Sequence, residues 1–454
     1  MKKYRFHAIL LLLALVCSLF SLPAAAADEL DLYCTNAILV DANYDEVLFE
    51  KNAYDKAYPA SMTKVMTALL TLEALEKGTV TLDTLVTVSD FAARKDFPDE
   101  STANLKSGEQ MSVKDLLYCL MLPSANDAAK ALAEHLGGSV DAFALLMNQR
   151  AGQLGCQNTN FINPHGLHNE NHYTCAYDMA RMFMAAMEHD LFLEIISTPS
   201  YTAAATNLSK ERFFFNTNGL ISNLYYSGHV YDKCIGGKTG STDEAGRCLV
   251  SSAVDGDKQM VSVIMGSGPI EIDGKTRQGQ FTESKKLLEY GFNNFRRVTL
   301  SRPDEPVDKL TVTLSQEADE VMVKPQGSLT LTLPTSIREE DIQSEISLFS
   351  DTVEAPVAEG QVLGSMRLYY EDREFGELDL VAVTSVERSE LLYKKMLFLN
   401  FMDEYGSRIA IGAGLAVLLI AIVIFLLRRG RRRTYRSSRH RGRAGGNYRG
   451  GRRR

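Results

Sequence analysis

The sequence predicts an α/β fold in which helices cover a β-sheet, followed by a small all-β domain and one transmembrane helix. Strand-like segments lie at both ends of residues 28–296, with helical segments between them. Apolar and polar residues alternate over 297–388, as in strands with one exposed face. A run of 19 uncharged residues over 409–427 is long enough to cross a bilayer as one helix.

The N-terminus has the order of a secretory signal peptide. Three basic residues precede the apolar run AILLLLALVCSLFSL, and the small residues PAAAAD follow it. This order predicts a signal peptide over residues 1–27, so the rest of the chain is expected to leave the cytoplasm.

The segments after the leader are predicted from their periodicity. NAILVDANYDEVLFE holds two short strand-like runs around a polar turn, and SMTKVMTALLTLEALEKG has helical spacing up to Gly78. SVKDLLYCLML and SVDAFALLMNQRAGQL each begin with a serine that can cap a helix, and NDAAKALAEHLGG between them ends at paired glycines. KCIGGKTGSTDEAGRCLVSSAV and KQMVSVIMGS are predicted as consecutive strands, before a helix from about Glu283 to Phe295. A helical block between two sets of strands predicts a lobe, with a cleft where lobe and sheet meet.

The segment over 297–388 predicts a small β domain. DKLTVTLSQ, GSLTLTLP and SEISLFSD alternate apolar and polar residues and are separated by turns. This domain has no cluster of catalytic residue types, which favours a spacer or partner-contact role. SELLYKKMLFLNFMDEYG follows it and predicts a juxtamembrane helix over 389–408.

The C-terminal end predicts a membrane anchor with its tail in the cytoplasm. Residues 428–454 contain thirteen arginines and no acidic residue, and arginines directly after a spanning helix mark the cytoplasmic side. We therefore expect a single-pass protein of the cell membrane, with the domain over 28–296 outside the cell. The alternative for 409–427 is a buried core helix, but such helices rarely run this long without a polar residue.

The charge of the outer portion argues against a nucleic-acid partner. Removing the three basic residues of the leader and the thirteen of the tail from 49 leaves 33 against 57 acidic residues, a net charge of −24. Phosphate binding needs a basic surface, so no nucleic acid is expected there. The tail segment RGRAGGNYRGGRRR is similar to RNA-binding Arg/Gly segments, but orientation and contact with anionic lipid explain it with fewer assumptions. The sequence leaves the oligomeric state open.

Six cysteines lie outside the leader. They are Cys34, Cys119, Cys156, Cys175, Cys234 and Cys248. An even number outside the cell permits disulfides, but the spacing is neither dense nor paired, which favours mostly buried free thiols. Cys234 and Cys248 are the one pair to test, since they flank a predicted hairpin.

The first motif with chemical meaning is Ser-x-x-Lys at the start of the first helix. Residues three apart share a face of a helix, so Ser61 and Lys64 are expected to project together. A neutral lysine can take the serine proton and an ammonium cannot, so the pair can act only where burial or a neighbouring cation lowers the lysine pKa. Alone, this motif is weak evidence.

Two further motifs follow in the chain. LMLPSANDAA places Ser124 and Asn126 between two helices, where either side chain could instead be a helix cap. GGKTGSTDEAG places Lys238, Thr239 and Gly240 on a strand, beside glycines that let another backbone approach closely.

The three motifs, together with FINPHGLHNENHYTCAYDMA and GGKTGSTDEAGRCLV, resemble the low-molecular-mass serine D-Ala-D-Ala carboxypeptidases, which are penicillin-binding proteins. The resemblance covers roughly residues 30–390. It implies an α/β (α+β) penicillin-binding, serine β-lactamase-like transpeptidase fold, with an antiparallel sheet, a helical lobe and a C-terminal β domain of the family's type.

The resemblance also implies roles for the matching residues. Ser61 would be the nucleophile and Lys64 its general base, with Ser124 in the proton relay. The backbone N–H groups of Ser61 and Ser241 would form the oxyanion hole. The residues implied in substrate binding are Asn126, Lys238, Thr239, Gly240 and Ser241.

The implied substrate is the D-Ala-D-Ala end of a peptidoglycan stem peptide, lying along the Lys238 strand as an added strand. Attack on the penultimate D-Ala carbonyl would release D-Ala, and water would hydrolyse the acyl-enzyme. A β-lactam would acylate the same serine as a covalent inhibitor. No cofactor and no metal are expected.

One position departs from the family's pattern. Family members often carry a basic residue just before Asn-Gly in the segment that matches NTNGL, and here that residue is Thr217. The second anchor for the substrate carboxylate is therefore open, and Arg247 on the following strand is a candidate substitute.

Three other functions stay open. A class A β-lactamase shares the motifs but needs a Glu with an Asn four positions later, whereas Glu170 is followed there by Thr174. A zinc peptidase could use His165, His168 and His172, but their spacing lacks His-Glu-x-x-His, and histidines that pack a loop through hydrogen bonds are favoured. A catalytically inert, membrane-tethered wall-binding protein would keep the cleft without the chemistry.

Overall fold

The computed structural model describes residues 30–272, 274–300 and 303–437. The predicted signal peptide and the end of the Arg-rich tail lie outside the described residues. The chain forms two compact units. The first ends at Val298 and also includes Leu331–Arg338, and the second consists of Thr299–Thr330 and the residues from Glu339 onward.

The first unit is built on a five-stranded antiparallel sheet with the order β2-β1-β9-β8-β7, which confirms the predicted sheet. Gly256 has φ +63° in the tight turn between β8 and β9, a conformation that favours glycine. The strand at one edge carries the Lys-Thr-Gly motif. The strands are β1 (Asn36–Asp41), β2 (Glu46–Lys51), β7 (Cys234–Thr242), β8 (Gly246–Asp255) and β9 (Lys258–Ser267).

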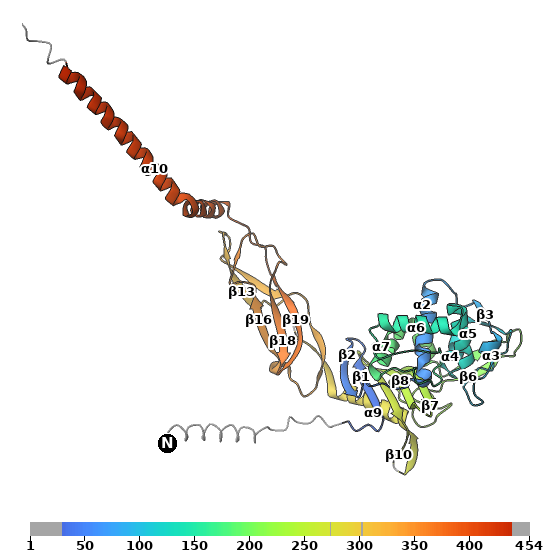
Figure 1. The fold of residues 1–454 in the computed structure, drawn as a ribbon. Helices are drawn as coiled ribbons and strands as arrows, with labels where there is room; N and C mark the ends of the chain where they lie inside the picture. Colours follow the sequence, from blue (N-terminus) through green and yellow to red (C-terminus); the bar gives the residue numbers. More distant parts are fainter. Residues whose placement is uncertain (1–29, 273, 301–302, 438–454) are drawn as a thin grey trace, which may run out of the picture. The chain divides into compact units, whose positions relative to one another are not determined.

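Helices cover both faces of this sheet (Figure 1). One face carries a helical lobe inserted in the chain between β2 and β7, as predicted, and the other carries α9 (Gly279–Asn294). The lobe consists of η1 (Ala60–Thr63), α2 (Lys64–Glu76), α3 (Asp90–Ala93), α4 (Val113–Met121), α5 (Asn126–Gly137), α6 (Val140–Gln153), α7 (Ala176–Met187) and α8 (Asp190–Ser197).

Side-chain alternation on the central strands explains this layering. Ile38 and Val40 of β1 pack in the core of the lobe, whereas Ala37 and Leu39 pack in the core that includes Phe281 of α9. Both faces of the strand are therefore buried, which is why AILV is a continuous apolar run instead of an alternating one.

Local signals set the ends of several lobe helices. The Ser112 and Ser139 hydroxyls accept hydrogen bonds from the backbone N–H groups of Asp115 and Ala142, so each serine caps its helix as predicted. Gly138 ends α5 with φ +77°, the left-handed conformation common at a helix C-cap.

Some elements of the first unit have no counterpart among the predicted ones. They are α3, α7, α8 and several short paired strands. The strands have three to four residues each, which is too few to show a period in the sequence. In addition, α9 begins four residues before the predicted start. The short pairs are β3 (Leu85–Thr87) with β4 (Gln110–Ser112), β5 (Ser200–Ala203) with β6 (Arg212–Phe215), and β10 (Pro269–Ile272) with β11 (Lys275–Gln278).

The second unit contains a six-stranded sheet with the order β16-β18-β19-β14-β13-β17, which confirms the predicted β domain. Its own apolar core includes Leu310, Val323 and Leu380. β12 (Phe295–Thr299) and β15 (Thr330–Pro334), most of whose residues belong to the first unit, pair separately. The strands of the sheet are β13 (Asp308–Thr313), β14 (Glu320–Pro325), β16 (Gln343–Leu348), β17 (Thr352–Glu354), β18 (Val362–Tyr370) and β19 (Arg373–Ala382).

The chain ends, within the described residues, in the long helix α10 (Glu390–Ser437). It joins the predicted juxtamembrane and transmembrane segments in one continuous helix. In the part of the chain that the structure describes, this is the one helix long and apolar enough to cross a membrane. Leu415 and Ile420 are exposed on it, which argues against a buried core helix.

All six described cysteines are free thiols, and all except Cys234 are buried. In the ladder between β7 and β8, Cys234 lies opposite Ala253 and Cys248 lies opposite Gly240. The two thiols therefore do not pair, although they flank the hairpin. The prediction of free thiols is confirmed for the described residues.

Candidate active site

The three motifs meet in one cleft, where η1 and the start of α5 lie against β7. Ser61 lines two cavities there, of about 210 Å³ and about 440 Å³. The smaller one is also lined by Ser124, Thr239 and Arg247, and the larger one by Asn126.

Ser61 and Lys64 lie across a junction between two kinds of helix. The sequence predicts both on one α-helix, but Ser61 belongs to the 3₁₀ turn η1 and Lys64 is the first residue of α2. Residues three apart eclipse each other in a 3₁₀ turn, so the pair still meets, with Lys64 Nζ 3.0 Å from Ser61 Oγ. Ala60 has φ +46°, a strained backbone conformation that is common at functional sites.

The surroundings of Lys64 fix the direction of its amine. Nζ donates hydrogen bonds to Asn126 Oδ1 at 2.7 Å and to the His165 carbonyl oxygen at 2.8 Å. A neutral amine has two hydrogens and one lone pair. Because these two acceptors take both hydrogens, the lone pair faces the Ser61 hydroxyl, which is the arrangement that a general base needs.

The position of Lys64 lowers its pKa well below the usual lysine value. Its side chain is 0% exposed, and burial disfavours the charged form. The charge of Lys238 acts in the same direction, whereas Glu100 and Asp127 favour the ammonium. The net effect is a lowered pKa, so Lys64 loses its proton more readily than an exposed lysine does.

Ser124 and Asn126 lie where α4 turns into α5. Ser124 has φ +65°, and its hydroxyl oxygen accepts a hydrogen bond from Lys238 Nζ at 2.9 Å. The N-cap residue of α5 is Ala125, which has no capping side chain. The interpretation of Ser124 or Asn126 as a helix cap is therefore wrong, because both side chains contact lysines of the cleft.

Strand β7 brings the Lys-Thr-Gly motif to the cleft. Lys238 Nζ also donates to the Thr239 carbonyl oxygen at 2.9 Å, and burial lowers the pKa of Lys238 to about 7. Gly240 lies directly against η1, since a Cβ at this position would be 2.8 Å from the Pro59 carbonyl oxygen. The absence of a side chain thus allows the strand to approach the turn that carries Ser61.

The smaller cavity has the chemistry of an anion site. The hydroxyl oxygens of Thr217 and Thr239 lie 2.6 Å apart, and Thr239 and Ser241 line the cavity together with Arg247. No described residue makes a hydrogen bond or an ion pair with the Arg247 guanidinium. This cation is thus available to a ligand in the cavity that Thr217 lines without contributing a charge.

The larger cavity is acidic, and one of its residues was not identified from the sequence. Its walls include Asp99, Glu100, Asp243 and Glu244. Glu100 Oε2 accepts a hydrogen bond from Asn126 Nδ2 at 3.4 Å, and the Glu100 side chain is 1% exposed. No local pattern identifies Glu100, because it reaches the site from a loop 26 residues before Asn126.

The three histidines of the 163–172 loop make contacts that hold the loop. The His172 ring accepts a hydrogen bond at Nδ1 from the Ile162 N–H at 3.0 Å, so Nε2 carries the proton that it donates to Thr63 Oγ1 at 2.8 Å. Burial lowers the pKa of His172 to about 4. The His168 ring packs edge-on against Tyr58. Within the described ranges, no group of three or more His, Cys, Asp or Glu residues is placed to hold a metal ion.

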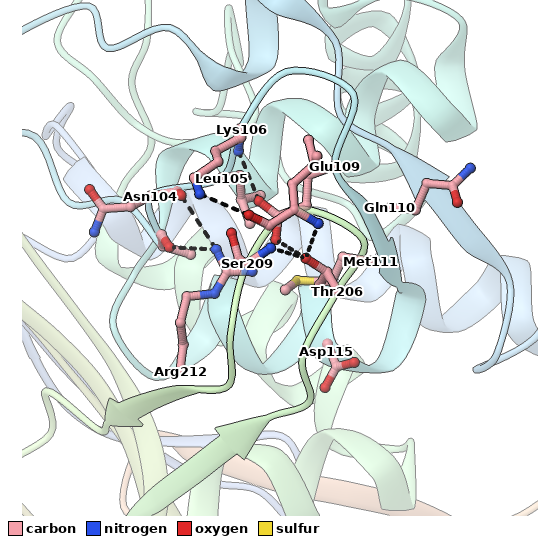
Figure 2. A network of polar contacts seen from close by, with 12 residues as sticks. Asn104, Leu105, Lys106, Glu109, Gln110, Met111, Asp115, Thr206, Ser209 and Arg212 are labelled. Atoms are coloured by element: carbon pink, nitrogen blue, oxygen red, sulfur yellow. Dashed lines mark hydrogen bonds and ion pairs between the residues drawn. The ribbon is translucent and has the colours of Figure 1, made fainter.

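A polar network holds the segment that follows Glu100 (Figure 2). Arg212 donates hydrogen bonds to the buried Glu109 carboxylate and, at 3.2 Å, to the Ala103 carbonyl oxygen. The Thr206 hydroxyl donates to the same carboxylate at 2.8 Å, and so does the Lys106 N–H at 2.9 Å. The network therefore ties residues 103–109 to the strand β6 and the loop before it.

Comparisons with known proteins agree with this geometry. Residues 23–268 match the model of the D-alanyl-D-alanine carboxypeptidase family, and residues 295–388 match that of the C-terminal domain of penicillin-binding protein 5. D-alanyl-D-alanine carboxypeptidase DacF from Bacillus subtilis is 32% identical over 78% of this chain and 86% of its own length. DacA from Escherichia coli K12 is 31% identical over 85% of this chain and 94% of its own.

The solved structures give the same result. Penicillin-binding protein 5 from Haemophilus influenzae superimposes with a TM-score of 0.63 at 30% identity, covering 79% of this chain and 98% of its own. Penicillin-binding protein 6B from Escherichia coli gives a TM-score of 0.59 at 28% identity, covering 77% and 96%. The chain therefore belongs to the D-alanyl-D-alanine carboxypeptidase family of serine-type, low-molecular-mass penicillin-binding proteins.

Proposed function

We propose that this protein removes the terminal D-Ala from peptidoglycan stem peptides through an acyl-enzyme on Ser61. The observation that carries the proposal is the direction of the Lys64 amine. Asn126 and His165 take both hydrogens of a neutral amine, and its remaining direction faces the Ser61 hydroxyl at 3.0 Å. The membership of the carboxypeptidase family supports the same reaction.

The first step forms the acyl-enzyme. Ser61 Oγ bonds to the carbonyl carbon of the penultimate D-Ala while its proton passes to Lys64 Nζ. The backbone N–H groups of Ser61 and Ser241 are the proposed donors to the oxyanion. The bond to the terminal D-Ala then breaks, and the nitrogen of this D-Ala receives the proton held by Lys64, with Ser124 as the proposed relay. The Ser124 hydroxyl is held by Lys238, whose Nζ lies 2.9 Å from it.

The second step restores the enzyme. A water molecule attacks the ester carbon, and Lys64 Nζ takes one of its protons. The bond to Ser61 Oγ breaks, and this oxygen recovers the proton from Lys64. The products are a shortened stem peptide and free D-Ala, and a β-lactam would acylate Ser61 in the same way but leave slowly.

The substrate carboxylate is proposed to lie in the smaller cavity. Thr239 can donate a hydrogen bond to it, and Lys238 adds positive charge from behind the strand. Arg247 would supply the second anchor, because its guanidinium lines this cavity without a partner among the described residues. Thr217 would orient the Thr239 hydroxyl, from which it lies 2.6 Å.

The peptide itself is proposed to lie along β7. This strand is at the edge of the sheet, so it can pair with one more extended strand. Asn126, which contacts Lys64, would also hold the acyl side of the peptide. Gly240 would let β7 bring the peptide close to the turn that carries Ser61.

The placement of the protein is proposed from its sequence and α10. We propose a signal peptide over 1–27, a catalytic domain over 28–296 outside the cell, a β domain over 297–388 and a single spanning helix over 409–427. The arginines after this helix support a cytoplasmic C-terminus.

The decisive experiment is the release of D-Ala from a diacyl-Lys-D-Ala-D-Ala peptide by the full chain in detergent, with mass spectrometry of the intact protein after penicillin. We expect D-Ala release and a penicilloyl adduct, both lost in Ser61→Ala. Rapid turnover of penicillin without D-Ala release would indicate a β-lactamase instead. A chain with neither activity nor adduct would be an inert wall-binding protein, and the proposal would be wrong.

A further inference from the structure

The cleft contains a buried ion pair that the proposed mechanism does not use. The side chains of Lys130 on α5 and of Glu100 are each 1% exposed, and Lys130 Nζ lies 4.0 Å from Glu100 Oε1. Lys130 Nζ also donates to Asp96 Oδ2 at 3.0 Å and to the Arg94 carbonyl oxygen at 2.7 Å. A buried ion pair is often less stabilising than apolar side chains of similar volume. Its presence on a helix whose buried face is otherwise mostly alanine and leucine therefore indicates a role beyond stability.

One side chain connects this pair to the general base. Asn126 donates to Glu100 Oε2 at 3.4 Å through Nδ2 and accepts from Lys64 Nζ at 2.7 Å through Oδ1. Lys130 follows Asn126 by four residues on α5, so the two share a face of the helix. Lys64, Glu100, Lys130 and Asp96 therefore form a row in which basic and acidic groups alternate.

Lys130 lies next to a Glu100 oxygen that lacks a hydrogen bond. Glu100 Oε1 is buried and has no hydrogen-bond partner among the residues that the structure describes. Among the described residues, the Lys130 ammonium is the cation that lies within 4.0 Å of this oxygen. Without that ammonium, a buried carboxylate one amide away from Lys64 would be uncompensated.

We infer that Lys130 is a positioning residue of the active site, which compensates Glu100 beneath Asn126 and so keeps Lys64 free to accept the Ser61 proton. The inference rests on the proposed function. An uncompensated Glu100 would stabilise the Lys64 ammonium, which cannot act as a base. Conversely, Lys130 without Glu100 would destabilise that ammonium.

Other ionisable groups face these residues and stay unchanged in the test. Arg94 lies 4.0 Å from Asp96, beside Lys130. Because all of these groups are the same in every variant, a difference between variants reports the Glu100 and Lys130 charges. The groups that face Lys64 from β7, α5 and the 163–172 loop are Lys238, Asp127, His165 and His172.

The test is the pH dependence of Ser61 acylation by a fluorescent penicillin, measured on the full chain in detergent. Lys130→Met should move the acidic limb of the rate profile upward by about one pH unit, and Glu100→Gln should move it downward by a similar amount. The double variant should return close to the wild type, since both charges are gone. A general loss of stability would instead lower the rate at every pH.

The matched control is Arg150→Met. It breaks a half-buried ion pair between Arg150 Nε and Glu73 Oε1, 2.6 Å apart, on α6 and α2 and outside the motifs of the cleft. This variant should leave the acidic limb in place. A full adduct yield at alkaline pH shows that a variant is folded.

Two outcomes would overturn the inference. One is a Lys130→Met protein that reaches full adduct with an unmoved limb, and the other is a shift of both single variants in the same direction. Where Lys130→Met does not fold, Glu100→Gln alone decides, and an unmoved limb contradicts the inference. A wild type that forms no adduct at any pH would instead contradict the proposed function.

Discussion

A lysine can act as a base only where its surroundings favour the neutral amine. Burial does so at Lys64 by lowering its pKa. Acylation of Ser61 should therefore rise with pH as Lys64 loses its proton, well below the pH at which an exposed lysine titrates. Lys64→Arg should lower the acylation rate by about 1000-fold at every pH, because a guanidinium stays protonated. Stopped-flow acylation with penicillin measures the rate, and Lys114→Arg at an exposed position is the control. An active Lys64→Arg protein would show that Lys64 is not the base.

The second prediction at the residue scale concerns the anchor for the substrate carboxylate. Arg247→Gln should raise KM for a D-Ala-D-Ala peptide by about 10- to 100-fold and change kcat little, because the lost charge pair exists in both the ground state and the transition state. Steady-state kinetics of D-Ala release give both constants. Arg277→Gln, which lines a different cavity, is the matched control. If Arg247→Gln keeps the wild-type KM, the anchor lies elsewhere.

At the scale of elements, the stability of the cleft depends on how the segment 103–109 is tied down. Burial would raise the pKa of Glu109, but hydrogen bonds from Thr206 and Lys106 and the charge of Arg212 lower it overall. A carboxyl with a lowered folded pKa stabilises the fold above its unfolded pKa of about 4.3, and this contribution is lost as the pH falls through the folded value.

Glu109→Gln should accordingly lower the free energy of unfolding by about 3 kcal/mol near neutral pH, because it leaves Arg212 without its buried partner. The difference from the wild type should shrink as the pH falls below about 4. Urea denaturation at several pH values measures both effects. Glu345→Gln, in an exposed ion pair with Arg367, should change stability by less than about 1 kcal/mol. A Glu109→Gln protein as stable as the wild type would rule out this role of the network.

At the scale of the whole molecule, the proposed chemistry and the proposed membrane contact belong to different parts of the chain. The cleft and both cores around its sheet lie in the first unit, the second unit has its own core, and α10 carries the apolar surface. A chain that ends at residue 388 should leave the membrane fraction and keep D-Ala release from a soluble peptide within about twofold. Fractionation and D-Ala assays test this. Loss of activity in a truncated chain with an unchanged melting temperature would mean that α10 contributes to catalysis.

The sequence predicts some features well because their causes are local. The period of apolar residues, the serine caps and the paired glycines predict the sheet, four lobe helices and the β domain. Prediction from the sequence fails where elements are short or where the backbone is strained. Examples are the 3₁₀ turn at Ser61 and the left-handed conformation of Ser124. Both conformations depend on contacts with distant segments, so no local propensity indicates them.

By itself, the sequence determined the chemical groups of the candidate site, the layering of helices on a sheet and the long apolar helix, since each depends on neighbouring residues or on periodicity. Only the tertiary structure decided which groups meet. Lys64 contacts Asn126 over 62 residues of chain, and Lys238 contacts Ser124 over 114. The contact of Glu100 with Asn126 was decided in the same way, and so was the position of the Arg247 guanidinium, which has no partner among the described residues. Contacts between distant segments result from the packing of the whole unit.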